Sequence, residues 1–184
     1  MRTSILEGTW TMWRRISNSL VAILYAMVMS LGTAFAGTST ANLSVSTTVV
    51  NNCSIAATTN LQFNSYDPLS TSATLEQAPA VFSVSCTPGD NNQYIGLNTG
   101  QNGSHAAGTT RAMAGPSSNY LSYEIYSNAG HTTVWGNTQQ TGVAVPASTS
   151  ATQVQTFNAY GSIPAQQSII AGNYSDTVLA TINF

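Results

Sequence analysis

The sequence predicts an all-β domain, a two-sheet sandwich of the immunoglobulin type. Apolar and polar residues alternate with a period of two in several runs, and Gly, Pro, Asn and Ser separate these runs. No stretch beyond the N-terminal leader has a sustained helical period of 3.6 residues. The 184 residues allow one domain after processing. Short strands in a domain of this size are typical of such sandwiches.

The alternating runs locate the expected strands, each with one face buried and the other exposed. They span residues 43–49, 80–86, 93–98, 121–125, 141–145 and 174–184. In the third of them Ile95 and Leu97 should point inward. Residues 98–118 are rich in Gly, Ser and Thr and predict a long exposed loop, and residues 147–152 predict a shorter polar one.

The N-terminus has the pattern of a secretory signal. Arg14 and Arg15 precede an apolar stretch over 20–31, and Ala34-Phe35-Ala36 matches the small-x-small cleavage pattern. We therefore predict a signal peptide over residues 1–36, with Met12 as an alternative start. A membrane anchor is the competing interpretation, but the apolar run is shorter than the ~20 residues that a spanning helix needs. We expect no membrane span after the signal is removed.

The composition argues against nucleic acid as a partner. Charged residues make up 5% of the chain, and lysine is absent. Beyond the leader one arginine, Arg111, stands against five acidic residues, a net charge of −4 with neutral histidines. Neutralising several phosphates requires a basic patch that this composition lacks.

The cysteines are two, Cys53 and Cys86, and both follow the predicted signal. In an oxidising compartment the expected outcome is a disulfide, which stabilises a loop of this length by roughly 3–4 kcal/mol. The alternative is a metal site. Neither His105 nor His131 lies at zinc-ligand spacing from the cysteines, and no CxxC occurs. We expect no metal and no cofactor.

Catalytic motifs are not evident, so we expect no enzyme activity. GxSxG is absent, and Ser104 and His105 are adjacent in a Gly-rich stretch, where neighbouring side chains point to opposite faces. His131 follows a glycine and is expected in a turn. The five acids are expected to be solvated or to cap turns. These acids are Asp67, Glu76, Asp90, Glu124 and Asp176.

Aromatic side chains allow one binding hypothesis. A sugar-stacking platform could form from Tyr120, Tyr126, Trp135 and Tyr160. Trp and Tyr in strands more often pack in the core or on a sheet face, with the polar tip at the rim. A monomeric, secreted carbohydrate-binding module therefore remains an alternative function.

Several ordered blocks of the sequence resemble the spore coat protein U family, which includes the major subunits of archaic, Csu-type chaperone–usher pili. The first block is 52–55 (NCSI) with 61–69 (LQFNSYDPL), where Asn64 replaces the usual glycine. The second is 121–126 (LSYEIY) with 133–136 (TVWG). The third is 160–167 (YGSIPAQQ) with 171–178 (AGNYSDTV), followed by a terminal strand that ends on Phe184.

The resemblance implies an immunoglobulin-like fold that is incomplete by one strand, no enzyme activity, and polymerisation by donor-strand complementation. It also implies three kinds of partner: identical or related pilus subunits, a periplasmic chaperone and an outer-membrane usher. The expected location is the cell surface, as a fimbrium reached through the periplasm, where the polymer would support adhesion and biofilm formation. A spore-coat or extracellular matrix role is the close alternative.

The expected domains are the signal (1–36), an N-terminal donor strand (37–50) and a pilin-like domain (51–184). The donor strand would present Leu43, Val45, Thr47 and Val49 to a neighbour's groove, which an unpaired sheet edge leaves open. The alternative is that this segment is the domain's own first strand. The C-terminal strand should form the edge of the groove where chaperone binds, with Tyr174, Val178, Ala180, Ile182 and Phe184.

Overall fold

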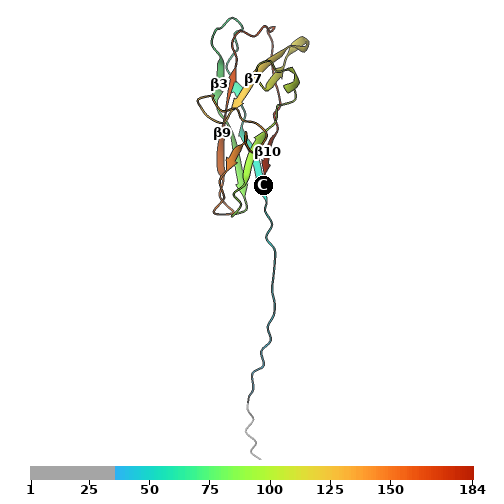
Figure 1. The fold of residues 1–184 in the computed structure, drawn as a ribbon, viewed down its shortest axis with the longest axis vertical. Coiled ribbons are helices and arrows are strands. Elements are labelled where there is room, and N and C mark those ends of the chain that lie inside the picture. Colours follow the sequence, from blue (N-terminus) through green and yellow to red (C-terminus); the bar gives the residue numbers. More distant parts are fainter. Residues whose placement is uncertain (1–35) are drawn as a thin grey trace, which may run out of the picture. The chain divides into compact units, whose positions relative to one another are not determined.

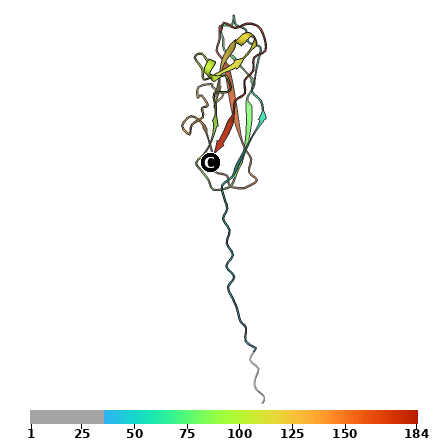
Figure 2. The ribbon, with the colours of Figure 1, turned by 90° about the vertical axis from the view of Figure 1, so that its right-hand side faces the viewer.

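The computed structural model describes residues 36–184, so most of the expected signal, including the alternative start at Met12, lies outside the described residues. The chain divides between Thr47 and Thr48 into two units, and the second unit carries the fold. It is built of two antiparallel sheets (Figures 1 and 2). The all-β prediction is therefore confirmed. Within residues 36–184 no helix is long and apolar enough to cross a membrane.

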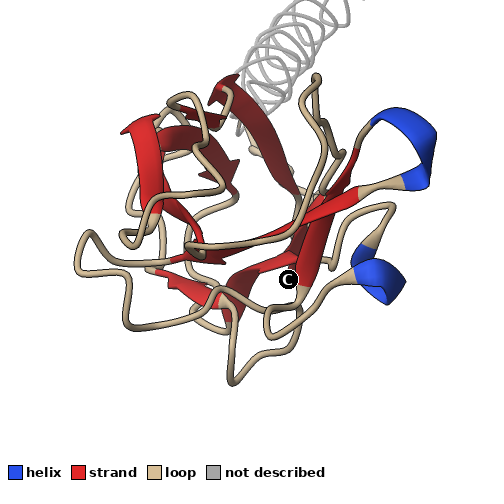
Figure 3. Cartoon of the chain, turned by 90° about the horizontal axis from the view of Figure 1, so that it is seen from above, coloured by secondary structure: helices blue, strands red, loops and turns tan. Residues whose placement is uncertain are grey.

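The larger sheet has seven strands and the smaller has three. The larger sheet comprises β1 (Cys53–Thr59), β2 (Gln62–Phe63), β3 (Thr74–Ala78), β4 (Ala80–Cys86), β6 (Arg111–Ala114), β7 (Tyr120–Tyr126) and β9 (Gln155–Ile163). The smaller comprises β5 (Gln93–Leu97), β8 (Val143–Val145) and β10 (Ala180–Asn183), in the order β10-β5-β8. Seen from above, two short 3-10 helices, η1 (Gly103–His105) and η2 (Pro116–Ser118), lie outside the sandwich (Figure 3).

Strand β9 joins the parts of the larger sheet. Its first half pairs with β4, from Gln155 opposite Val84 to Ala159 opposite Ala80. Its second half has two partners, because Ser162 lies opposite both a residue of β3 and one of β7. The nine residues of β9 thus hold together strands that lie far apart in the sequence.

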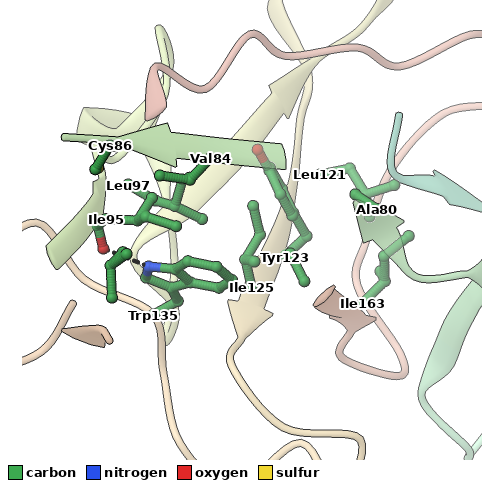
Figure 4. Close-up of a cluster of buried hydrophobic side chains, with 12 residues drawn as sticks. Ala80, Val84, Cys86, Ile95, Leu97, Leu121, Tyr123, Ile125, Trp135 and Ile163 are labelled. Atoms are coloured by element: carbon green, nitrogen blue, oxygen red, sulfur yellow. Dashed lines mark hydrogen bonds between the residues drawn. The ribbon is translucent and has the colours of Figure 1, made fainter. Parts of the chain in front are cut away.

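The core follows the period-two pattern. The predicted strands over 80–86 and 93–98 are formed, and Ile95 and Leu97 are buried as expected. Trp135 is fully buried, and its Nε1–H donates to the Ile95 carbonyl at 2.8 Å (Figure 4). Phe82 meets the Trp135 ring edge-on, with centroids 5.8 Å apart, a favoured aromatic geometry.

The two cysteines form a disulfide. Cys53 begins β1, Cys86 ends β4, and the two lie opposite each other in the ladder. Since β1 is at one end of the larger sheet, the disulfide fixes this strand to its single neighbour.

The prediction of an exposed loop over residues 98–118 was wrong for the part around Arg111, although residues such as Ser104 and His105 are exposed. This segment contains β6, η1 and η2, and Arg111 is only 1% exposed. Its small polar residues let the chain lie against the outer face of β7, where the Ala107 N–H donates to Ser122 Oγ at 2.9 Å. Strand β7 is consequently buried on both faces.

The prediction that all five acids are solvated or cap turns is correct for only some of them. Asp67 and Asp90 do cap turns, by accepting bonds from the N–H groups two residues onward. Glu124, however, is 4% exposed and forms an ion pair with Arg111. Glu76 accepts bonds from His131 and from the backbone of β9. A buried charge persists when other groups satisfy it, and here those groups come from distant segments.

Two of the predicted strands are shorter in the structure. The C-terminal one is regular only over β10, because Ser175 pairs as an isolated bridge with Ala114 of the other sheet before the chain crosses over. The strand expected from residue 141 begins at Val143, since a turn anchored on the Thr138 carbonyl holds the preceding residues. Residues 43–49 form no strand and are exposed.

Candidate functional site

An open groove of about 1080 Å³ runs along the domain. One wall is formed by the end of β1 and the segment to Tyr66, and the other by residues 169–178. Its floor consists of core residues from both sheets, including Leu97, Leu121 and Ile125. The groove therefore gives access to the hydrophobic core.

Unpaired sheet edges accompany the groove. β1 pairs only with β4, and β10 pairs only with β5, among the strands that the structure describes. β1 and β10 contact each other, whereas the segments that continue from β1 and lead into β10 form the separate walls. A strand edge without a partner presents a row of free N–H and C=O groups.

Tyr66 connects the first wall to residues 164–167, the segment that precedes the second wall. Its hydroxyl donates to the Pro164 carbonyl at 3.0 Å and accepts from the Gln167 N–H at 2.8 Å. The side-chain amide of Gln167 also pairs with the backbone of Ser122 in β7, through bonds of 2.8 Å to both its N–H and its carbonyl. The Gln167 side chain thus makes the two hydrogen bonds that the backbone of a neighbouring strand would otherwise make to Ser122 of β7.

Asp176 fixes the second wall. Its Oδ1 accepts from the Gln101 N–H at 3.0 Å and from Asn102 Nδ2 at 3.1 Å, while its Oδ2 accepts from the Tyr123 hydroxyl at 2.9 Å. Asn98 adds a second anchor, because its Oδ1 accepts from the Leu179 N–H at 2.9 Å. These bonds explain why the segment that lines the groove is held in place although it is not a regular strand.

Tyr123 is a polar group inside this apolar site. Its ring packs edge-on to Phe63, with centroids 6.0 Å apart. Burial, and then the hydrogen bond to the Asp176 carboxylate, raise the pKa of Tyr123 above its ordinary value. The phenol therefore stays protonated and donates to Asp176.

The N-terminal segment exposes an apolar face. Leu43, Val45 and Val49 are 87%, 85% and 79% exposed, and Thr47 lies on the same face of an extended chain. The intervening residues, among them Ser44 and Ser46, are polar. Within residues 36–50 no secondary structure is assigned.

The residues expected at the C-terminal edge fall in three places. Tyr174 and Val178 line the groove. Ala180 and Ile182 are half-buried in β10, opposite Leu97 and Ile95. Phe184 lies beyond the strand and is 55% exposed.

The four aromatics do not form a common platform, because Trp135 is in the core. Tyr120 stacks on His105 at a centroid distance of 3.7 Å. Tyr126 and Tyr160 lie opposite each other on β7 and β9, and His131 packs edge-on to both. His131 lies in a turn, as expected, but its Nε2 also lies 2.9 Å from Glu76 Oε2. No group of three potential metal ligands occurs in residues 36–184.

Sequence reasoning missed three of the groups that build the groove: Tyr66, Gln167 and the Tyr123–Asp176 pair. All lie in the blocks quoted for the family resemblance, and those blocks were the available signal. Their roles depend on contacts between residues that are 45 to 101 positions apart. Period-two patterns contain no information on contacts at that separation.

Comparison with known proteins gives relatives for this chain. Protein U of Myxococcus xanthus is 34% identical over 171 residues, which cover 86% of this chain and 92% of that protein. A solved structure, the CsuC–CsuE chaperone–tip adhesion subunit pre-assembly complex from archaic chaperone–usher Csu pili of Acinetobacter baumannii, is 22% identical with a TM-score of 0.49. That similarity covers 74% of this chain and 41% of the matched chain, so this chain spans less than half of its length.

The Spore Coat Protein U domain matches residues 39–181, which include the groove and most of the N-terminal segment. The resemblance seen in the sequence blocks is confirmed by this match, and the chain belongs to the spore coat protein U domain family.

Proposed function

We propose that this protein is a structural subunit of a surface pilus, assembled by the chaperone–usher route through donor-strand complementation. The observation that carries the proposal is a groove open to the core, in a chain whose N-terminal segment has a matching exposed apolar face. An extended segment adds to a sheet edge through main-chain hydrogen bonds, and its alternate side chains fill pockets. The occupant we assign to the groove is residues 37–50 of a second copy.

The energetics support a long-lived polymer. Each aliphatic side chain that passes from solvent to a buried site contributes about 1.5–3 kcal/mol. Leu43, Val45 and Val49 are all highly exposed before insertion. Each ladder hydrogen bond adds about 0.5–1.5 kcal/mol. The alternative is that this segment is the domain's own first strand, which would bury the same side chains within one copy.

Location and partners follow from this assignment. The signal over residues 1–36 would deliver the chain to the periplasm, where a chaperone would cover the open groove and an usher would pass subunits to the cell surface. The polymer would support adhesion and biofilm formation. Enzyme activity is not part of this proposal.

Two other functions remain as alternatives. A polymer in a spore coat or extracellular matrix is the variant that the family description favours, and it would use the same groove. A monomeric carbohydrate-binding module is less well supported, because the only tryptophan among the four candidate aromatics is fully buried.

The deciding experiment compares two donor variants of the full chain. Val45→Asp places an unpaired carboxylate in an apolar groove, which costs several kcal/mol, whereas Ser46→Asp places the same charge on the opposite face of the strand. Surface material is extracted without heating and separated on denaturing gels. We expect ladders of polymers from wild type and Ser46→Asp, and only short or capped assemblies from Val45→Asp. Polymers of wild-type length from Val45→Asp, or from a chain lacking residues 38–49, would falsify the proposal.

A further inference from the structure

We infer that Thr47 sets the register of the inserted strand by donating a hydrogen bond to the hydroxyl of Tyr123 in the acceptor groove. This inference rests on the proposed function, because it assigns a specific contact to the donor segment of a second copy. It concerns which of several possible alignments the segment adopts.

The apolar side chains of this segment do not by themselves define one register in the groove. Every second residue from Leu43 to Val49 lies on its inward face, and three of these four, Leu43, Val45 and Val49, are similar aliphatic side chains. A slip of two residues along the groove keeps this face inward and, at positions that Thr47 does not occupy, exchanges one aliphatic side chain for another. Apolar burial is non-directional and cannot by itself distinguish such alignments. A polar contact at one position can.

Thr47 is the polar interruption of that face, between Val45 and Val49. A hydroxyl buried without a hydrogen bond costs about 1–3 kcal/mol, and buried side-chain polar atoms in native structures almost always have a partner. In the register that the complex adopts, Thr47 must therefore lie beside a polar group of the groove.

The groove offers one such group on its floor. Of the lining residues that are buried, Tyr123 is the only one with a polar side chain; the others are alanine, leucine or isoleucine. Its O–H donates to Asp176 Oδ2 at 2.9 Å, which leaves lone pairs on the phenol oxygen free to accept. The bond to Asp176 fixes the position of that oxygen.

The neighbours of Tyr123 complete the match. Leu121 and Ile125 flank it on the same face of β7, so the floor reads apolar, polar, apolar at two-residue intervals. Val45, Thr47 and Val49 have the same order and the same spacing. Strands of facing sheets in a sandwich run within about 30° of each other. Placing Thr47 at Tyr123 therefore puts both valines over apolar floor.

The test exchanges two side chains within the donor. Peptides of residues 37–50 with the native sequence, and with Val45→Thr and Thr47→Val together, have identical composition and differ only in where the hydroxyl lies. The acceptor is the full mature chain with Val45→Asp, which cannot donate to itself. Peptide dissociation is followed by fluorescence, with the wild-type groove and with Tyr123→Phe.

In the wild-type groove we expect the exchanged peptide to dissociate about 5- to 100-fold faster than the native one. With Tyr123→Phe the two peptides should dissociate at similar rates, because neither hydroxyl then has a partner on the floor. Any general weakening of the fold by Tyr123→Phe acts on both peptides and cancels in their ratio. If Tyr123→Phe fails to fold, the comparison in the wild-type groove decides alone.

The outcomes separate this inference from the proposed function. If both peptides bind and dissociate at equal rates from the wild-type groove, Thr47 does not set the register, and donor-strand complementation stands. If the peptide preference persists in Tyr123→Phe, another group receives the hydroxyl and the inference is wrong. If neither peptide binds and Val45→Asp chains still polymerise, the proposed function itself fails.

Discussion

Arg111 and Glu124 form a buried ion pair between neighbouring strands β6 and β7, with their side chains 1% and 5% exposed. The guanidinium also donates to the carbonyls of Asn98, Leu97 and Trp135, at 3.0, 3.2 and 2.7 Å. Arg111 thus belongs to the larger sheet and bonds to the end of β5 in the smaller one. Arg111, the only arginine or lysine after residue 36, is therefore a structural element of the sandwich.

Removing one member of this pair should destabilise the domain strongly. Arg111→Met would leave the Glu124 carboxylate buried without its cation, and three carbonyls would lose a donor. We expect the free energy of unfolding to fall by about 3–5 kcal/mol, measured by urea denaturation of the mature chain. The double variant Arg111→Met/Glu124→Leu removes both charges and should recover part of the loss. Equal stability of Arg111→Met and wild type would contradict the role given to the pair.

Burial of Arg111 also determines how the protein responds to trypsin. Residues 37–184 contain no lysine and one arginine, so they have one possible cleavage site, after Arg111. Because that side chain is 1% exposed, we expect the folded protein to resist trypsin. The unfolded, reduced chain should give two fragments that meet between Arg111 and Ala112. Mass spectrometry of timed digests provides the measurement, and rapid cleavage of the folded protein would show that residues 98–118 are open to solvent after all.

Sequence patterns predicted the strands better than the contacts between them. The strands at 80–86 and 93–97 follow directly from the alternation of Phe82, Val84, Ile95 and their neighbours. The segment over residues 98–118 was misjudged because Gly, Ser and Thr are common both in solvated loops and in chain that lies flat on a sheet. What distinguishes the two cases is a partner such as Glu124, 13 residues away from Arg111.

The candidate site, too, could be predicted from the sequence only in part. The exposed apolar face of residues 43–49 could be predicted, since it depends on the period of the sequence alone. The groove walls could not, because they depend on Tyr66 bonding to Gln167 and on Asp176 bonding to Tyr123. The terminal strand was predicted too long for a related reason: Ser175 pairs with Ala114 in one sheet before β10 joins the other.

Glu76 should make stability depend on acid pH. Burial raises the pKa of this carboxyl, but the hydrogen bond from His131 and the bonds from backbone N–H groups outweigh burial and hold the pKa below its ordinary value of 4.5. The native state therefore binds this proton more weakly than the unfolded chain does. The resulting stability is present above pH about 4.5 and is lost as the pH falls through the lower, native pKa.

The Glu76→Gln variant tests this expectation. Thermal unfolding between pH 7 and pH 2.5 should show a smaller decrease for Glu76→Gln than for wild type over the acidic part of the range. Asp90→Asn is the matched control, because it makes the same change of acid to amide in an exposed turn. If the two variants have the same pH profile, the contact between His131 and Glu76 does not contribute to acid sensitivity.

Tyr66 gives the last prediction, on the geometry of the groove. Its hydroxyl bridges the wall that follows β1 and residues 164–167, through the bonds to Pro164 and Gln167. Tyr66→Phe keeps the ring and removes both bonds, leaving the Gln167 N–H without this partner. A lost partner of this kind costs about 1–3 kcal/mol, and we expect that decrease in the free energy of unfolding.

The stronger expectation for Tyr66→Phe concerns donor binding, because the wall would be free to move away from the groove floor. Peptides of residues 37–50 should dissociate faster from Tyr66→Phe, whether or not they carry the Val45/Thr47 exchange. Tyr174→Phe is the control: it removes a hydroxyl on the opposite wall that bonds only within that wall, to the Ile170 carbonyl at 2.8 Å. A Tyr66→Phe protein that loses stability but binds the peptide with unchanged kinetics would show that Tyr66 supports the fold and does not shape the groove.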